Sequence, residues 1–199
     1  ESVLRVFSQA IRSGYAPGYN GKEEDAFCKE FASYLGGGYA DGVNSGTNSV
    51  FVALHALDLP PFSEVIVGPV TDPGGIMPIV MLNCIPVVAD AEPGSFNTGA
   101  AQVEACITPR TSAIVIPHIG GAPADIKAIM KVAKKHKLPV VEDCAQSHGT
   151  LFNGKQAGTF GDIGCFSFYP TKGLGGFGDG GCIVTDDEAL TTARELACR

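Results

Sequence analysis

From residue 39 onward, short apolar runs alternate with segments in which apolar residues recur every three or four positions. The short runs are rich in valine and isoleucine and predict β-strands, whereas the periodic segments predict helices. The predicted strands cover 39–43, 64–67, 85–89, 112–116, 138–141, 163–168 and 181–184. The predicted helices cover 47–57, 75–82, 99–106 and 124–136, and a last helix runs from 186 or 187 toward 198.

This alternation, with short connections, predicts an α/β fold in which a mainly parallel sheet carries helices on both faces. In such sheets, ligands bind at the carboxyl ends of the strands, where the loops gather. We therefore expect a site formed by the three loops that follow Val43, Val141 and Phe168.

Two further helices are predicted before the first strand. Apolar residues at positions 3, 4, 6, 7, 10 and 11 form a helical stripe, and the segment 22–35 carries three acids in its first turn, where the helix dipole favours them. We interpret residues 1–36 as a helical arm that packs on the sheet or on a neighbouring subunit. Residues 37–199 form the ligand-binding domain in this interpretation.

Composition excludes several classes of protein. The chain has 199 residues, of which 45% are hydrophobic and 18% are charged, and its formal net charge is −7. This acidic balance argues against nucleic-acid binding, and the lysines at 131, 134, 135 and 137 fall near a predicted helix end, where solvated cations are common. No apolar run is long enough for a bilayer, so no membrane partner is expected. Seven scattered cysteines favour free thiols in a reducing compartment, and we expect a cytoplasmic protein.

Three features of the expected loops point to one cofactor. Asp143 ends a nearly continuous apolar run, where a carboxylate is costly unless it meets a cation or good donors. Lys172 precedes a glycine-rich loop, and residues 44–47 join a strand to a helix whose free N–H groups suit a phosphate. An acid for a ring nitrogen, an amine for an aldehyde and amides for a phosphate are what pyridoxal phosphate requires.

Each feature alone also has an ordinary structural interpretation. Ser45 or Thr47 can simply cap a helix, and Asp143 can cap the segment that follows it. Lys172 can be a solvated loop lysine. The combination of the three favours the cofactor site.

Several other motifs are weaker. Residues 149–155 resemble a nucleotide P-loop, but Gln156 stands where a magnesium-binding hydroxyl is required, and residues 173–178 match a dinucleotide pattern that is followed by a strand. Cys144 and His148 have the spacing of a helical metal pair, but no second pair completes a tetrahedral set. We expect no metal, and we expect a structural or supporting role for this pair.

An ordered series of motifs resembles the DegT/DnrJ/EryC1/StrS family of sugar aminotransferases, which are fold-type I pyridoxal phosphate enzymes. The resemblance runs from about Gly18 to the C-terminus. It rests on Asn44-Ser45-Gly46-Thr47, Glu142-Asp143-Cys144-Ala145-Gln146-Ser147-His148-Gly149, Gly161-Asp162, Phe166-Ser167-Phe168, Thr171-Lys172 and Gly178-Asp179-Gly180-Gly181. It implies a large domain with a seven-stranded sheet, and a homodimer.

The resemblance also implies a role for each matching residue. Lys172 would bond the cofactor aldehyde and then move the proton of the reaction, while Asp143 would keep the pyridine nitrogen protonated. Gln146 would hydrogen-bond the ring hydroxyl. The cofactor phosphate would be held by Gly46, Thr47 and Ser167.

The activity implied is transfer of an amino group from glutamate or glutamine to a keto sugar, often nucleotide-linked, or to a related cyclic ketone. Dehydratases of the same family carry a histidine in place of the lysine, so Lys172 disfavours that alternative. A second alternative is a catalytically incompetent binding or regulatory protein, or a fragment, that keeps the fold.

Two departures from the family pattern stand out. After Thr71 the family usually places an aromatic residue that stacks on the cofactor ring, whereas this chain has Asp72. Family members are also longer, so the resemblance implies a C-terminal small domain that these 199 residues lack.

Overall fold

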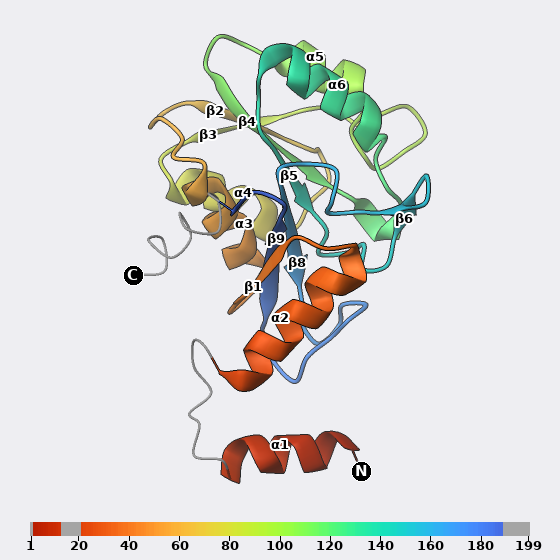
Figure 1. The fold of residues 1–199 in the computed structure, drawn as a ribbon. Helices are drawn as coiled ribbons and strands as arrows, with labels where there is room; N and C mark the ends of the chain where they lie inside the picture. The colour runs from red at the N-terminus through yellow and green to blue at the C-terminus, as the bar shows by residue number, and fades with distance from the viewer. Residues whose placement is uncertain (1, 13–20, 189–199) are drawn as a thin grey trace.

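The computed structural model describes residues 2–12 and 21–188, and a seven-stranded sheet lies at its centre (Figure 1). The strand order is β1-β9-β8-β5-β4-β2-β3. The strands are β1 (Tyr39–Val43), β2 (Glu64–Val67), β3 (Ile85–Val88), β4 (Thr111–Pro117), β5 (Val140–Asp143), β8 (Ile163–Ser167) and β9 (Gly181–Thr185). β9 pairs antiparallel with β1 and β8, and the other pairings are parallel. The predicted fold class and the seven strands are confirmed.

Helices cover both faces of the sheet (Figure 1). One face carries α3 (Gly46–Ala56) and α4 (Pro73–Met81), and the other carries α2 (Lys22–Leu35), α5 (Ala100–Cys106) and α6 (Ile126–His136). Successive residues of a strand face opposite sides, so Val141 joins the core beneath α3 while Val140 joins the core beneath α6. β5 is buried along its whole length, including Glu142 and Asp143 at its carboxyl end.

The N-terminal region contains α1 (Ser2–Arg12) and α2. The side chains of Phe31 and Leu35 pack with Phe166, and the Phe31 and Phe166 rings meet edge to face with centroids 5.0 Å apart. α2 therefore belongs to the core over β8 and β9. The boundary between an arm at 1–36 and a domain at 37–199 stays a prediction.

The predicted elements agree with the observed ones except at some ends. The strand predicted at 138–141 begins at Val140 instead, because the N–H of Leu138 still bonds to Ala133 at the end of α6. The helix predicted at 124–136 begins at Ile126, after the N-cap Asp125. A hairpin of β6 (Leu151–Phe152) and β7 (Lys155–Gln156) was not predicted, because two-residue strands carry no periodicity. From residue 189 onward, the predicted final helix lies outside the described residues.

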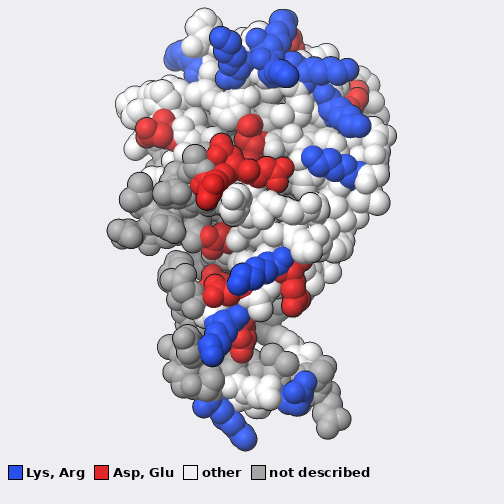
Figure 2. Space-filling model, viewed as in Figure 1, with Lys and Arg blue, Asp and Glu red and all other residues white. Residues whose placement is uncertain are grey.

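Three further observations concern membrane spans, cysteines and basic residues. Within 2–12 and 21–188, no helix combines the length and the apolar character that a membrane span needs. Six cysteines lie in the described ranges, at 28, 84, 106, 144, 165 and 182, and all six are free thiols, five of them buried. The four lysines at 131, 134, 135 and 137 are exposed at the end of α6, and Figure 2 shows basic side chains gathered over that part of the molecule.

Candidate active site

The three expected loops meet at one edge of the sheet. β1, β5 and β8 run in the same direction, so their carboxyl ends share that edge. Gly46, Asp143 and Lys172 follow or end these strands. Close contacts join these loops to one another and to the first turn of α4.

The first turn of α3 presents two open amides. Ser45 is the N-cap, and its Oγ accepts the N–H of Asn48 at 3.1 Å. The N–H groups of Gly46 and Thr47 have no acceptor in the part of the chain that the structure describes. The capping interpretation of Ser45 is confirmed, and it is compatible with anion binding by the next two amides.

Gly46 makes the close contact between the first and third loops. A Cβ built on Gly46 would lie 2.5 Å from the Cβ of Ser167 and 2.9 Å from its Oγ. Any larger residue would push this turn away from the end of β8. Glycine at 46 therefore brings the open amides and the Ser167 hydroxyl to one place.

The first turn of α4 also lies at this edge, and it follows the position at which the family resemblance implies contact with the cofactor ring. Asp72 is its N-cap, and its Oδ1 accepts the N–H of Gly74 at 3.0 Å. A Cβ on Gly74 would lie 2.6 Å from Thr47 Oγ1, and a Cβ on Gly75 would lie 3.4 Å from Asp143 Oδ2. The first turns of α3 and α4 therefore contact each other, and the first turn of α4 lies beside Asp143.

Asp143 ends β5 with 9% of its surface exposed. Its Oδ1 accepts the N–H of Ala145 at 3.0 Å. Burial raises the pKa of Asp143, and the charge of Asp72 acts in the same direction, while the Ala145 amide and Lys172 oppose the rise. The hydrogen bond and nearby positive charge therefore do not offset the cost of burying the Asp143 carboxylate. A cationic N–H on a ligand would stabilise its charged form.

Lys172 lies half-buried after β8. Its backbone N–H donates to the carbonyl of Tyr169 at 2.8 Å, which fixes the turn that carries the side chain. Burial lowers the pKa of His148, and the positive charge of Lys172 lowers it further. The same charge favours the ionised form of Asp143. Lys172 is thus within electrostatic range of both groups.

Gln146 is tied to this edge less directly. Its side chain is exposed, and its Oε1 accepts the N–H of Gly120 at 2.8 Å. The Nε2 group has no acceptor among residues 2–12 and 21–188, so it is available as a donor. The structure places Gln146 on the Asp143 loop without a direct contact to the Asp143 carboxylate.

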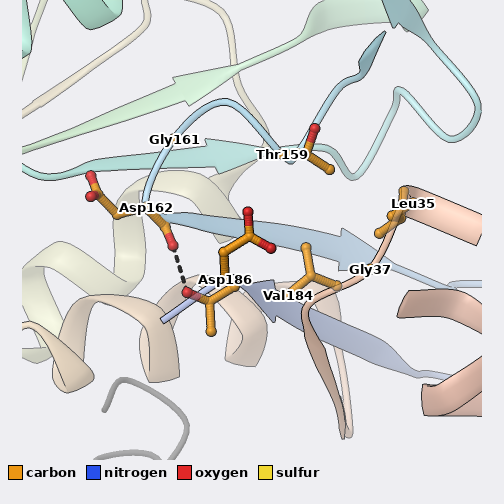
Figure 3. A pocket seen from close by; sticks show the side chains of 9 residues that line it. Leu35, Gly37, Thr159, Gly161, Asp162, Val184 and Asp186 are labelled. Carbon is orange, nitrogen blue, oxygen red and sulfur yellow. Dashed lines mark hydrogen bonds between the residues drawn. The ribbon is translucent and has the colours of Figure 1, made fainter. Parts of the chain in front are cut away.

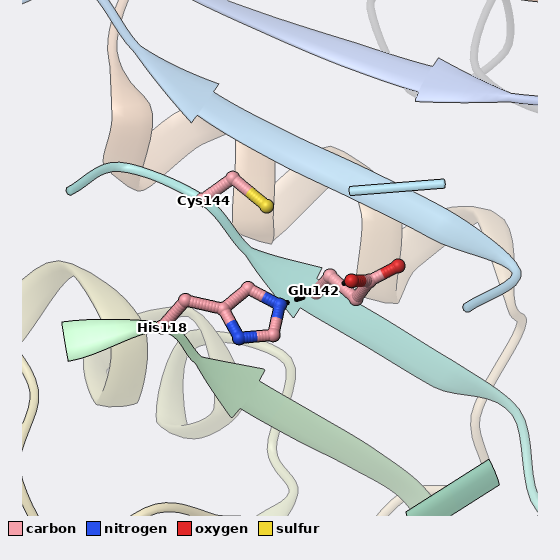
Figure 4. A group of neighbouring side chains, drawn as sticks. All are labelled: His118, Glu142 and Cys144. Carbon is pink, nitrogen blue, oxygen red and sulfur yellow. Dashed lines mark hydrogen bonds and ion pairs between the residues drawn. The ribbon is translucent and has the colours of Figure 1, made fainter. Parts of the chain in front are cut away.

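Glu142, which precedes Asp143 in β5, forms a buried pair with His118 that was not predicted from the sequence (Figure 4). His118 Nε2 and Glu142 Oε2 are 2.9 Å apart, and both side chains are fully buried. His118 Nδ1 accepts the N–H of Ala124, so Nε2 is assigned as the donor. The sequence did contain a signal for this pair, because His118 follows the apolar strand β4 and Glu142 follows the valines of β5.

Glu142 also accepts three backbone N–H groups, from Gly158, Phe160 and Gly161. Burial opposes ionisation, but the His118 hydrogen bond and these amides outweigh it and lower the pKa of Glu142. Cys144 lies close enough to His118 and Glu142 for a three-ligand metal cluster. The histidine and carboxylate atoms already make hydrogen bonds, so we interpret the pair as a structural one that positions β5, and the expectation of no metal stays a prediction.

The Cys144 and His148 pair does not have the helical geometry that its spacing suggested, because residues 144–149 form turns. Burial raises the pKa of the Cys144 thiol well above its ordinary value, so it is a poor nucleophile. Both ring nitrogens of His148 are buried, and neither makes a hydrogen bond of regular geometry within the described part of the chain. A structural or supporting role is consistent with this environment.

The remaining glycine motifs are not nucleotide sites. Residues 149–155 lead into and out of β6, and no helix follows residues 173–178 within the described ranges. A small pocket between Leu35, Asp162 and Asp186 lies at the opposite edge, before β8 (Figure 3). Asp162 has a structural role there, since its Oδ2 accepts the N–H of Val140 at 2.7 Å.

Asp143→Asn is expected to stabilise the cofactor-free protein at neutral pH. Because the folded-state pKa of Asp143 is raised, its stability contribution is full at low pH and is lost as pH rises through that value. Asparagine keeps the acceptor for Ala145 without the charge, for a gain of about 1 kcal/mol or about 2–4 °C in Tm. Thermal melts across pH should show that the stability gain becomes smaller toward acid pH.

Asp90→Asn, at an exposed aspartate, is the control and should leave the Tm unchanged. An Asp143→Asn variant that is less stable than wild type at neutral pH would contradict the assignment.

These residues fit pyridoxal phosphate. Open amides at Gly46 and Thr47 lie where glycine allows a close approach to Ser167, which suits a phosphate. Asp143 is a buried carboxylate short of positive partners, which suits a protonated ring nitrogen. Lys172 supplies an amine within electrostatic range of Asp143.

The chain is also similar to known aminotransferases. The chain is 44% identical over 170 residues to the UDP-N-acetyl-3-dehydro-alpha-D-glucosamine 3-aminotransferase of Acidithiobacillus ferrooxidans, covering 85% of this chain and 46% of that protein. It is 38% identical over 198 residues to the L-glutamine:2-deoxy-scyllo-inosose aminotransferase of Micromonospora echinospora, covering 97% and 47%. The chain thus spans about half the length of these relatives.

A solved structure and a family model agree with these relatives. The structure of NtdA from Bacillus subtilis with bound cofactor PMP superposes with a TM-score of 0.89 at 30% identity, covering 96% of this chain and 43% of that one. The model of the DegT/DnrJ/EryC1/StrS aminotransferase family matches residues 2–198. The chain therefore belongs to the DegT/DnrJ/EryC1/StrS aminotransferase family.

Proposed function

We propose that the whole protein transfers an amino group from glutamate or glutamine to a keto sugar or a related cyclic ketone, with pyridoxal phosphate as cofactor. The observation that carries this proposal is the convergence of Asp143, Lys172 and the N-terminus of α3 at one edge. Family membership and the names of the relatives support it.

When bound, the cofactor supplies an aldehyde for the amine and a ring that accepts electrons from the reacting carbon. The role of Asp143 is to hold the proton on the ring nitrogen, since a buried carboxylate favours a cationic donor beside it. His118 and Glu142 position Asp143 by fixing the end of β5.

Lys172 carries the amine and moves the proton at the reacting carbon. The backbone amides of Gly46 and Thr47, with the hydroxyl of Ser167, bind the phosphate. The free amide donor of Gln146 binds the ring hydroxyl.

The substrates follow from the relatives. One relative is named for a nucleotide-linked keto sugar and another for L-glutamine and 2-deoxy-scyllo-inosose, a cyclic ketone. A lysine at 172 favours amino transfer over dehydration.

We also propose that the protein is a cytoplasmic homodimer. Five buried free thiols are typical of a reducing compartment. Membership of the family is the support for dimerisation. Size-exclusion chromatography with light scattering on the whole protein would test the assembly.

The test of the function is titration of the whole protein with pyridoxal phosphate, followed by addition of L-glutamate or L-glutamine. Wild type is expected to gain visible absorbance that the amino donor then removes. Gly46→Ala should bind the cofactor about tenfold more weakly, a loss of roughly 1.4 kcal/mol, because its methyl group displaces the turn from Ser167.

Gly178→Ala is the matched control, since a Cβ there meets nothing within 4 Å and should leave cofactor affinity unchanged. Failure of wild type to bind pyridoxal phosphate would reject the proposal. Cofactor binding without any response to either amino donor would instead support a catalytically incompetent protein.

A further inference from the structure

The Asp72 carboxylate has an oxygen that helix capping does not use. Oδ1 accepts the Gly74 N–H at 3.0 Å and holds the side chain at the start of α4. The side chain is exposed, and Oδ2 has no hydrogen-bond partner among the described residues. One oxygen is therefore fixed in place and the other is open to solvent or a ligand.

This carboxylate belongs to the edge that carries the candidate site. Within the same turn, Gly74 packs against Thr47 Oγ1 and Gly75 lies beside Asp143 Oδ2. The charge of Asp72 also disfavours ionisation of Asp143. Asp72 is thus within electrostatic range of the proposed ring-nitrogen partner.

The carboxylates of Asp72 and Asp143 limit which ligand groups can bind beside them. A ligand that brings hydroxyl or ammonium donors relieves the repulsion, whereas a carboxylate or phosphate placed there increases it. A hydrogen bond to a charged acceptor is also stronger than one to a neutral acceptor.

We propose that Asp72 is a specificity-determining residue whose outer oxygen accepts hydrogen bonds from hydroxyl or ammonium groups of the amino-group acceptor. Asp72 thereby selects polyhydroxylated rings and disfavours acceptors that place an anionic group directly against its outer oxygen. The inference rests on the proposed function and deepens it by assigning the acceptor chemistry to a residue of this chain.

Asp72→Asn separates this role from helix capping, because asparagine also accepts the Gly74 N–H at an N-cap. Asp125→Asn is the matched control, since Asp125 caps α6 through Oδ1 and is likewise exposed. Both variants should keep the wild-type Tm and the wild-type Kd for pyridoxal phosphate.

The probes are 2-deoxy-scyllo-inosose, UDP-N-acetyl-3-dehydro-glucosamine and the amine that corresponds to each ketone. With the cofactor-loaded whole protein, Asp72→Asn should raise the KM for the accepted ketone about tenfold and leave kcat nearly unchanged. Calorimetry should show about the same loss of affinity for its amine. Asp125→Asn should match wild type in both measurements.

Two results would overturn the inference. One is an Asp72→Asn variant with wild-type KM and amine affinity, and the other is a wild-type protein that binds neither amine. If wild type binds an amine but converts neither ketone, the proposed function fails, while the amine affinity of Asp72→Asn still decides the role of Asp72.

Discussion

Lys172→Ala is expected to abolish amino transfer by the whole protein. The substitution removes the amine that bonds the cofactor aldehyde and the group that moves the proton, and a positioned acid–base group alone contributes about 10²- to 10⁴-fold. The backbone turn that carries residue 172 depends on an N–H to Tyr169, which alanine retains. The fold should therefore survive, and the Tm should remain close to that of wild type.

The measurement combines turnover with borohydride reduction and mass spectrometry of the cofactor-loaded protein. Wild type should gain the mass of the reduced cofactor on the peptide that contains Lys172, and Lys172→Ala should gain none. Lys172→Arg keeps the positive charge near Asp143 but lacks the nucleophile, so it should behave like alanine. Lys134→Ala, at an exposed lysine on α6, should behave like wild type. Undiminished turnover by Lys172→Ala would falsify the assignment.

Glu142→Ala is expected to destabilise the fold by about 3–5 kcal/mol, the cost of leaving several buried hydrogen-bond donors without their acceptor. It leaves three backbone amides, at Gly158, Phe160 and Gly161, without their acceptor. It also leaves His118 Nε2 unpaired in a fully buried position. Urea unfolding of the cofactor-free protein should show the loss as a lower midpoint.

The pH dependence gives an independent readout for Glu142. The pKa of this carboxyl is lowered in the fold, so its contribution is present above its ordinary pKa and is lost as pH falls through the lowered value. The stability gap between wild type and Glu142→Ala should therefore narrow in acid. Glu104→Ala is the control, because Glu104 pairs with Lys135 on the surface. Equal unfolding midpoints for wild type and Glu142→Ala would contradict the role of the pair.

The sequence by itself determined the alternation of strands and helices and the edge at which ligands should bind. Strand and helix periodicities are local, and the ends of parallel strands share an edge whatever the details of packing. The motifs therefore placed Asp143, Lys172 and Gly46 on loops that share one edge of the sheet, and their roles stay predictions. The ends of the strands were predicted less well. The strand predicted from 138 begins at Val140, because the N–H of Leu138 bonds to Ala133 at the end of α6, which apolar character does not reveal.

Only the tertiary structure decided which distant residues touch. The contact of Gly46 with Ser167, the pair of His118 with Glu142, and the approach of the Asp72 turn to Asp143 each join segments far apart in the chain. Such contacts depend on strand order and register, which leave no periodic signal in any one segment. For the same reason Asp72, an anomaly in the sequence, is in the structure a helix cap with one carboxylate oxygen open beside the site.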